Sequence, residues 1–215
     1  MSKFVYYIKA AVVKVALYLI DKVGIRPKVI FTDPGRKKFR YDGPVIFVGN
    51  HTSYYDGIMT TEEFAKTKPY VVLAKDWFDK PAFCWYLKKH RCISMDRYNL
   101  DTEWLRQAKE AIHNGSSVIM YPEGKTSKEP FPDEFKSGFV ILALLTGAKI
   151  VPFAIEGQYK MVFGRRQRLM VSEPVELTKE GKGMNPKYLE AESERFRQIV
   201  IEMKKLLKGD KKNGF

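Results

Sequence analysis

Cysteine and histidine are scarce in this chain of 215 residues. Its two cysteines are Cys84 and Cys92, and its three histidines are His51, His90 and His113. Two cysteines are too few for a disulfide framework, and no histidine stands at a metal-binding spacing from a cysteine or a carboxylate. The sequence therefore predicts no disulfide and no metal site. Because the cysteines have apolar neighbours, we expect them to be buried and not nucleophilic.

The chain also lacks an apolar run long enough to cross a membrane. Its most apolar N-terminal segment, Phe4–Ile20, is shorter than the roughly 20 residues of a spanning helix and contains Lys9 and Lys14. These lysines, and the absence of a small-residue cleavage site, disfavour a secretory signal. We expect residues 1–23 to form an amphipathic helix, either on the membrane interface or packed on the domain. The interfacial position is favoured by the rings of Tyr6, Tyr7 and Tyr18.

Acidic residues are fewer than basic ones. The chain has 38 Lys and Arg against 25 Asp and Glu, so its formal net charge is +13. Such a charge favours an anionic partner: nucleic acid, an anionic membrane surface or a phosphorylated substrate. The basic residues are scattered among apolar strands and no nucleic-acid motif appears, so we expect no nucleic-acid partner. We predict a peripheral or monotopic protein on the cytoplasmic face of a membrane.

Apolar runs that fit strands alternate with segments that fit helices. Strands are expected at residues 44–50, 70–74, 92–95, 118–121, 149–155 and, as an edge strand, 168–172. Helices are expected at residues 56–66, 82–89, 101–114, 135–146 and 186–208. Turns and at most one short strand fit residues 24–42. This alternation predicts a single α/β domain over residues 24–215, with a mostly parallel mixed sheet flanked by helices.

Polar side chains follow three of the expected strands. His51 follows the first strand, Arg97 follows the strand at 92–95, and Glu123 follows the strand at 118–121. Ligands of parallel sheets gather at the carboxyl ends of the strands, where loops and helix N-termini converge. We therefore expect these three residues to lie on one rim of the sheet.

The segment Asn50–Gly57 (NHTSYYDG) contains a histidine and an aspartate five positions apart. In a continuous helix such residues face apart, so His51 and Asp56 can meet only if the chain turns between strand and helix. Asp56 could then orient the imidazole, whose second nitrogen would accept a proton. No Ser or Cys nucleophile is evident beside the pair, so a substrate hydroxyl would attack. Alternatively, His51 is a solvent-facing or capping residue and Asp56 only serves the helix start.

Four blocks occur in order along the chain: NHTSYYDG at 50–57, MDRYN at 95–99, YPEGKTS at 121–127 and KIVPFAIEG at 149–157. With these blocks the chain resembles the 1-acylglycerol-3-phosphate acyltransferase family over residues 44–157, roughly half of its length. The resemblance implies transfer of a fatty acyl group from acyl-CoA or acyl carrier protein to lysophosphatidic acid, giving phosphatidic acid without a cofactor.

The resemblance also implies roles for residues of the first two blocks. His51 would be the general base and Asp56 its orienting residue, in agreement with the argument from their spacing. Lys75 and Arg97 would bind the phosphate of the acceptor through charge-assisted hydrogen bonds. In a chain with this many basic residues, each could instead be a surface cation.

The third block departs from the pattern of the family, which usually reads Phe-Pro-Glu-Gly-Thr-Arg-Ser. Glu123 and Gly124 match, and the carboxylate would orient a substrate hydroxyl or a cation. Thr126 replaces the arginine, whose phosphate contact would pass to Lys125, a point charge in place of a fork. This departure concerns the acceptor more than the acyl transfer itself. In the fourth block, the residues that would shape the substrate pocket, unless they are only buried strand residues, are Val151 and Pro152.

Three other functions remain open. The first is the same acyl transfer to glycerol 3-phosphate, another lysophospholipid or a lipid alcohol, which the altered third block favours. The second is a non-enzymatic basic protein that binds anionic lipid or nucleic acid. The third is a hydrolase, in which water would take the place of the lipid hydroxyl.

Overall fold

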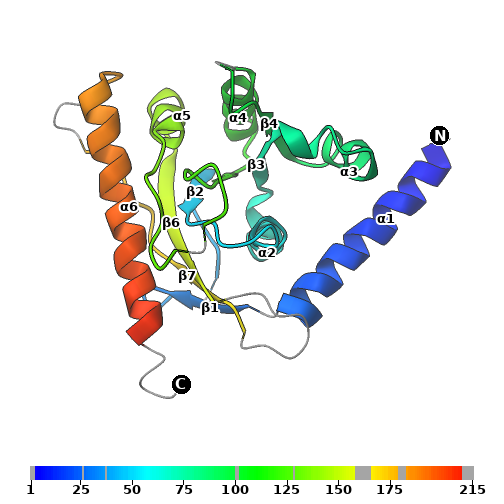
Figure 1. The fold of residues 1–215 in the computed structure, drawn as a ribbon, viewed down its shortest axis with the longest axis horizontal. Helices are drawn as coiled ribbons and strands as arrows, with labels where there is room; N and C mark the ends of the chain where they lie inside the picture. Colours follow the sequence, from blue (N-terminus) through cyan, green and yellow to red (C-terminus); the bar gives the residue numbers. More distant parts are fainter. Residues whose placement is uncertain are drawn as a thin grey trace.

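The centre of the protein is a seven-stranded sheet with the order β1-β7-β6-β2-β5-β3-β4 (Figure 1). The structure is a computed structural model that describes residues 3–25, 27–36, 38–99, 102–127, 129–157, 166–178 and 183–209. All paired strands are parallel except β6 and β7, which are antiparallel. The strands are β1 (Lys28–Phe31), β2 (Val45–Gly49), β3 (Tyr70–Ala74), β4 (Cys92–Met95), β5 (Val118–Met120), β6 (Lys149–Glu156) and β7 (Arg168–Val171).

Helices cover both faces of the sheet. Side chains of α4, α5 and α6 pack on one face, and α2 packs on the other (Figure 1). The helices are α1 (Lys3–Leu19), α2 (Asp56–Glu63), α3 (Pro81–Leu87), α4 (Glu103–His113), α5 (Gly138–Thr146) and α6 (Pro186–Gly209). The expected single α/β domain with a mostly parallel mixed sheet is therefore confirmed.

The central strand β2 is apolar throughout because it is buried on both faces. Ile46 and Val48 point toward α4, α5 and α6, whereas Val45 and Phe47 belong to the core on the α2 side. The ring of Phe47 stacks on Phe64 with 4.0 Å between centroids. Burying one such side chain stabilises a fold by about 1.5–3 kcal/mol. This packing on both faces fixes the direction in which β2 delivers the chain to residue 51.

One strand prediction is wrong. Residues 168–172 were expected to form an edge strand, but β7 lies inside the sheet between β6 and β1. The edge strand on this side of the sheet is β1, which pairs with β7 in parallel from Lys28–Arg168 to Phe31–Val171. Because β1 and β7 are far apart in the chain, no local pattern in the sequence indicates that they pair. The helix expected at 101–114 is α4, which begins at Glu103, while Asp101 lies outside the described residues.

The N-terminal helix α1 stands away from the sheet and is attached near both ends (Figure 1). Near its start, the Tyr6 ring lies edge-to-face with Trp85, at 5.8 Å between centroids, and the Lys89 ammonium lies 4.4 Å from the Tyr6 ring. After its last residue, a π-helical turn carries Lys22, which pairs with Glu63 of α2. The helix is thus joined to α3 and to α2.

The outward side of α1 is apolar. Its exposed Phe4, Ile8, Val12, Val15 and Leu19 follow the helical repeat, and with the neighbouring exposed apolar residues they form a stripe about 160° wide. The exposed lysines that flank the stripe are Lys9 and Lys14. Ala10, in contrast, is buried on the opposite side. In the described part of the chain, no helix combines the length and the apolarity needed to cross a bilayer.

Candidate active site

His51 and Asp56 meet at the carboxyl end of β2. The chain leaves the strand at Gly49, turns through residues 50–55 and enters α2 at Asp56. This turn brings the imidazole Nδ1 to 3.0 Å from the Asp56 Oδ2. The His51 side chain is 19% exposed and the Asp56 side chain is fully buried. The pair is therefore anchored inside the protein and open to solvent only at the imidazole.

The Asp56 carboxylate has further donors that fix its orientation. Its Oδ2 accepts hydrogen bonds from the backbone N–H groups of Thr52, at 2.6 Å, and Ser53, at 2.8 Å. Asp56 is also the first residue of α2, where the helix dipole favours an anion. An ionised carboxylate can only accept, so the His51 Nδ1 carries the proton of this bond, and in a neutral imidazole Nε2 then has the lone pair. Such an imidazole can take a proton from a ligand.

The backbone of His51 is held by the segment that follows β5. The His51 N–H donates to the Glu123 Oε1 at 2.7 Å, and the His51 carbonyl accepts from the Ser127 N–H at 2.8 Å. The second Glu123 oxygen accepts from the Asp133 N–H at 2.9 Å. Burial raises the pKa of Glu123, while the bonds from His51 and Asp133 act in the opposite direction. Glu123 thus ties the end of β2 to the 123–133 segment.

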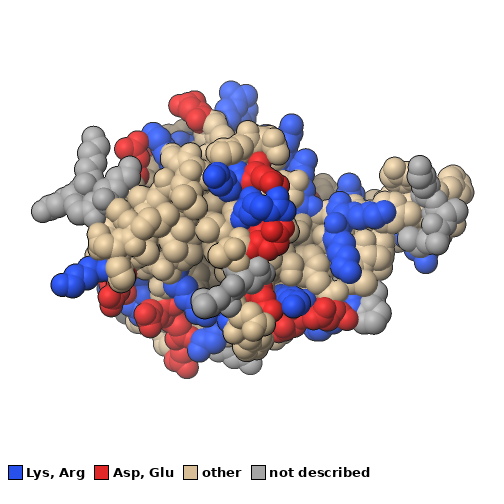
Figure 2. Space-filling view, turned by 90° about the horizontal axis from the view of Figure 1, so that it is seen from above, with Lys and Arg blue, Asp and Glu red and all other residues tan. Residues whose placement is uncertain are grey.

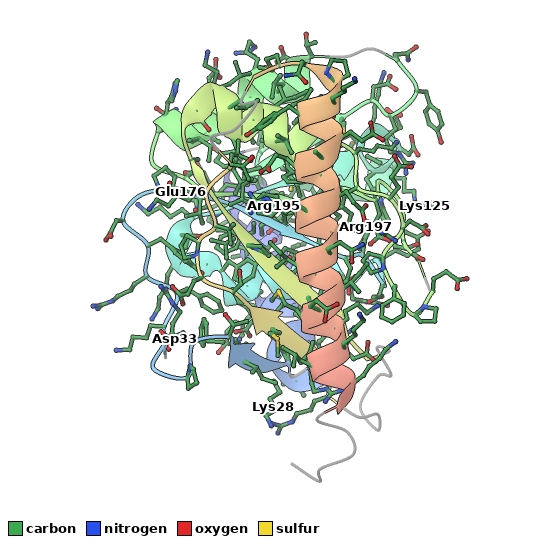
Figure 3. All side chains as sticks on the ribbon, turned by 90° about the vertical axis from the view of Figure 1, so that its left-hand side faces the viewer. Lys28, Asp33, Lys125, Glu176, Arg195 and Arg197 are labelled. Atoms are coloured by element: carbon green, nitrogen blue, oxygen red, sulfur yellow. The ribbon has the colours of Figure 1, made fainter. Side chains whose placement is uncertain are left out.

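Helix α6 supports this segment from behind. The Arg197 Nε donates to the carbonyl of Pro132, at 3.1 Å, and to that of Asp133, at 3.0 Å. Figure 3 shows Arg197 on the side of α6 that faces Lys125, in the same segment. The position of Glu123, and through it that of His51, therefore depends on contacts with the C-terminal helix.

The end of β2 is also locked to β6. The Asn50 side chain donates to the Ile155 carbonyl at 3.0 Å and accepts from the Ile155 N–H at 2.7 Å. At Gly49, a Cβ atom would lie 2.4 Å from the Phe153 ring and 2.5 Å from the Phe153 carbonyl oxygen. The approach of β2 to β6 therefore requires glycine immediately before Asn50 and His51.

Arg97, Lys75 and Lys125 lie around the His51 site, and each has an acidic partner. Arg97 donates to the Gly124 carbonyl at 2.7 Å and to Asp76 at 2.8 Å. The other two pairs are Lys75 with Asp96, at 3.2 Å, and Lys125 with Asp133, at 3.1 Å. Hydrogen bonds from the Asn99 side chain and the Tyr98 N–H, aided by Lys75, hold the pKa of Asp96 well below its usual value. These cations are exposed, so an anionic ligand could reach them.

The structure brings most of the predicted residues together. The expected rim is confirmed, because Glu123 contacts His51 and Arg97 contacts Gly124. Lys125 and Thr126 belong to the same segment. The two residues of the fourth block do not lie on the rim: they are buried inside β6, and Val151 is part of the core on the α2 side. The roles of all these residues stay predictions.

Several residues of the site were not expected from the sequence. The Tyr121 ring stacks on His51, and Asn50 joins β2 to β6. The exposed Lys136 brings its Nζ within 3.4 Å of the position that a Cβ of Gly124 would occupy, which adds a fourth cation. Lys136 follows the third block by some ten residues, so only the folded chain reveals its proximity. Asn50 and Tyr121 stand inside recognised blocks, but their contacts cross between strands.

Metal binding and thiol chemistry have little support among the described residues. Among them, no group of three His, Cys, Asp or Glu side chains is arranged to hold a metal ion. Burial raises the pKa of Cys92 to about 12, so its thiol is a poor nucleophile.

A cavity of about 310 Å³ opens at the end of the sheet opposite to His51, beside Val45 and Lys149 at the starts of β2 and β6. None of the predicted site residues lines it.

Known proteins resemble the chain in the region that contains these residues. A family model described as Acyltransferase matches residues 30–156. The chain is 28% identical over 123 residues to the 1-acyl-sn-glycerol-3-phosphate acyltransferase LPAT1, chloroplastic, of Arabidopsis thaliana, covering 56% of this chain and 34% of that protein. It is 29% identical over 148 residues to a Mycoplasma pneumoniae protein named "Probable 1-acyl-sn-glycerol-3-phosphate acyltransferase", covering 66% of this chain and 53% of that protein. The chain thus spans between about a third and about half of these relatives.

A solved structure has a similar fold. It is the crystal structure of the 1-acyl-sn-glycerophosphate (LPA) acyltransferase PlsC from Thermotoga maritima. The two chains are 24% identical, the TM-score is 0.65, and the similarity covers 91% of this chain and 80% of the other. This likeness concerns the fold and extends beyond the residues that the family model matches.

Replacing Glu123 by Ala should destabilise the protein, because it removes the acceptor of two backbone N–H groups. A buried donor that loses its partner costs about 1–3 kcal/mol. We expect a lower free energy of unfolding in urea, with a smaller loss for Glu123→Gln, which keeps one acceptor oxygen. Glu134→Ala, at the exposed position directly after residues 123–133, serves as control. Equal stability of Glu123→Ala and the control variant would contradict this account.

Proposed function

Because the chain belongs to the acyltransferase family, we propose that it transfers a fatty acyl group from acyl-CoA or acyl carrier protein to the free hydroxyl of 1-acylglycerol 3-phosphate, giving phosphatidic acid. The observation that carries this proposal is the contact between the His51 Nδ1 and the Asp56 Oδ2, at 3.0 Å, beside a group of cations. Such a pair provides a general base, and the cations provide donors for a phosphate.

His51 acts as the base in the proposed reaction. Its Nε2 removes the proton from the acceptor hydroxyl, and the hydroxyl oxygen attacks the thioester carbonyl carbon. A carbon–oxygen bond forms and the carbon–sulfur bond breaks. The leaving thiolate then takes the proton from Nε2. Asp56 stabilises the imidazolium that exists between these two proton transfers, and no metal or cofactor is needed.

Cations of the rim bind the phosphate of the acceptor. Arg97 is the strongest candidate because its planar guanidinium offers several donors in a fixed geometry. Lys75 and Lys125 add positive charge, and Thr126 can donate one hydroxyl hydrogen where the family usually has arginine. Glu123 and Gly124 act mainly by holding His51 and Arg97 in place, as their hydrogen bonds indicate.

Helix α1 attaches the protein to an anionic membrane surface. Its apolar stripe faces away from the sheet and has lysines at its borders, as in helices that lie in a bilayer interface. The lipid acceptor and product would then remain in the membrane. The net charge of +13 also favours an anionic leaflet. We propose a peripheral or monotopic position on the cytoplasmic face.

A second candidate is the same reaction with another acceptor. Thr126 favours it, because threonine stands where the family usually has arginine, a bidentate phosphate donor.

A non-enzymatic binder of nucleic acid is less well supported. Acidic and basic side chains are interspersed on the face seen from above in Figure 2, so the basic residues form no single continuous patch there.

Replacing His51 by Ala should abolish most acyl transfer. General-base assistance is worth about 10² to 10⁴ in rate, so kcat should fall by this factor while the protein stays folded. The assay follows labelled acyl-CoA with 1-acylglycerol 3-phosphate, and circular dichroism checks the fold. His113→Ala, at an exposed histidine of α4, should retain the parental rate. Parental turnover in His51→Ala would rule out its role as base.

Arg97→Lys should weaken binding of phosphorylated acceptors, because lysine cannot form the bidentate hydrogen bonds that a guanidinium forms with a phosphate. We expect KM for 1-acylglycerol 3-phosphate to rise about tenfold, which corresponds to about 1.4 kcal/mol. A panel with glycerol 3-phosphate, a larger lysophospholipid and a non-phosphorylated lipid alcohol tests the acceptor. Arg106→Lys, on the exposed side of α4, is the control. A preference of the parent protein for the non-phosphorylated alcohol would overturn the assignment of the substrate.

Val12→Glu should reduce binding to vesicles of phosphatidylcholine and phosphatidylglycerol. The substitution places a charge in the apolar stripe and removes an apolar contact, which should lower partitioning by about tenfold. Leu206→Glu is a matched control, because Leu206 of α6 is 62% exposed and Val12 is 63% exposed. Vesicle sedimentation measures both. Equal loss of binding in the two variants would show that α1 is not the attachment site.

A further inference from the structure

Tyr121 packs against the imidazole of His51. The two rings are stacked, with 4.3 Å between centroids and an angle of 24° between their planes. The Tyr121 ring also meets Phe153 edge-to-face, at 5.8 Å between centroids. Tyr121 follows β5 directly, while His51 follows β2, the strand beside it in the sheet. The neighbouring ends of two strands therefore hold these rings together.

The hydroxyl of Tyr121 is tied to α2. It lies 2.7 Å from the Thr60 Oγ1, and the Thr60 hydroxyl donates to the Asp56 carbonyl at 2.8 Å. Because Thr60 has a single hydroxyl hydrogen, the Tyr121 hydroxyl is the donor in their shared bond. Burial and the charge of Asp56 raise the pKa of Tyr121 well above its ordinary value, so the phenol remains protonated. This bond stops the ring from sliding over the imidazole.

These contacts form a closed chain from His51 to Asp56, Thr60, Tyr121 and back to His51. The hydrogen bond between Nδ1 and Asp56 fixes one edge of the imidazole, but it leaves the ring able to tilt about the line of that bond. A stacked ring blocks this tilt on one side. Together the two contacts determine where Nε2 points. Displacing a reacting group by about 1 Å can lower the rate about a hundredfold.

We propose that Tyr121 is a positioning residue that holds the His51 imidazole in its reactive orientation, and that its hydroxyl does so through Thr60. This inference rests on the proposed acyl transfer. Tyr121 acts through the orientation of the His51 ring. The hydroxyl is the part that phenylalanine, the usual residue at this position of the third block, would not provide.

Three variants separate the ring from its hydroxyl. Tyr121→Leu removes both, Tyr121→Phe keeps the ring, and Thr60→Val removes the acceptor of the hydroxyl. We expect kcat to fall about 10- to 100-fold in Tyr121→Leu and about threefold in Tyr121→Phe, with little change in KM for either substrate. The double variant Tyr121→Phe/Thr60→Val should be no slower than the slower single variant, because both changes remove the same bond.

A matched control lies outside the site. Tyr86 stacks on His90 with 3.9 Å between centroids and an angle of 10°, so Tyr86→Leu removes a similar stack without touching His51. Its kcat should equal that of the parent protein. A fall in kcat as large as that of Tyr121→Leu would mean that loss of any such stack disturbs the enzyme, and would overturn the inference.

Histidine NMR gives a readout that does not depend on turnover. The chain has three histidines, and His51→Gln identifies the ring signals of His51. The ring current of Tyr121 should shift these signals, so Tyr121→Leu should move them while Tyr121→Phe should leave them close to the parental positions. Unchanged His51 signals in Tyr121→Leu would overturn the inference even if its kcat were low.

The outcomes distinguish this inference from the proposed function. A folded parent protein without acyl transfer would refute the function, while the NMR comparison would still test the position of the imidazole. Parental kcat in Tyr121→Leu, with active parent protein, would refute only the role of Tyr121. If Tyr121→Leu does not fold, the two single variants Tyr121→Phe and Thr60→Val are compared with their double variant. Fully additive losses of activation free energy, calculated from kcat, would contradict a shared hydrogen bond.

Discussion

The hydrogen bond from the His51 N–H to Glu123 is the constraint on which the site depends. It joins the first residues after β2 to the segment after β5, and the opposite oxygen of the same carboxylate holds Asp133. Arg197 fixes that segment to α6. Because the carboxylate is buried, it has few alternative partners, and its two bonds set the spacing between the segments. The position of the His51 imidazole therefore depends on hydrogen bonds of the His51 backbone as well as on the contact of its side chain with Asp56.

Much of the fold follows from patterns that are local in the chain. The strands expected at 70–74 and 92–95 coincide with β3 and β4, and the alternation of strands with helices predicts a parallel sheet. Local patterns do not contain strand order, however. Residues 168–172 were expected at an edge, whereas β1 pairs with them through backbone hydrogen bonds that any sequence could form. Side-chain periodicity therefore identifies strands but not their neighbours.

The site was predictable where it depends on neighbours in the chain. The turn between His51 and Asp56 is contained in one short segment, and the two side chains meet as their chemistry suggested. The stack of Tyr121 on His51 joins the ends of two strands, and the pairs Lys75–Asp96 and Arg97–Asp76 join the segments after β3 and β4. Val151 looked like a pocket residue because it belongs to a recognised block, yet it packs in the core. Block membership does not reveal the direction of a side chain.

The pairing of Arg97, Lys75 and Lys125 with aspartates has a consequence for selectivity. Arg97 with Asp76, Lys75 with Asp96 and Lys125 with Asp133 are exposed pairs, and such pairs are worth about 0–1 kcal/mol each. An incoming anion would exchange with these carboxylates and gain only the difference between two attractions. A singly charged group gains little in such an exchange, whereas a phosphate monoester brings a second charge. The rim would therefore act as an ion exchanger that sorts ligands by valence, and a phosphodiester would compete poorly for it.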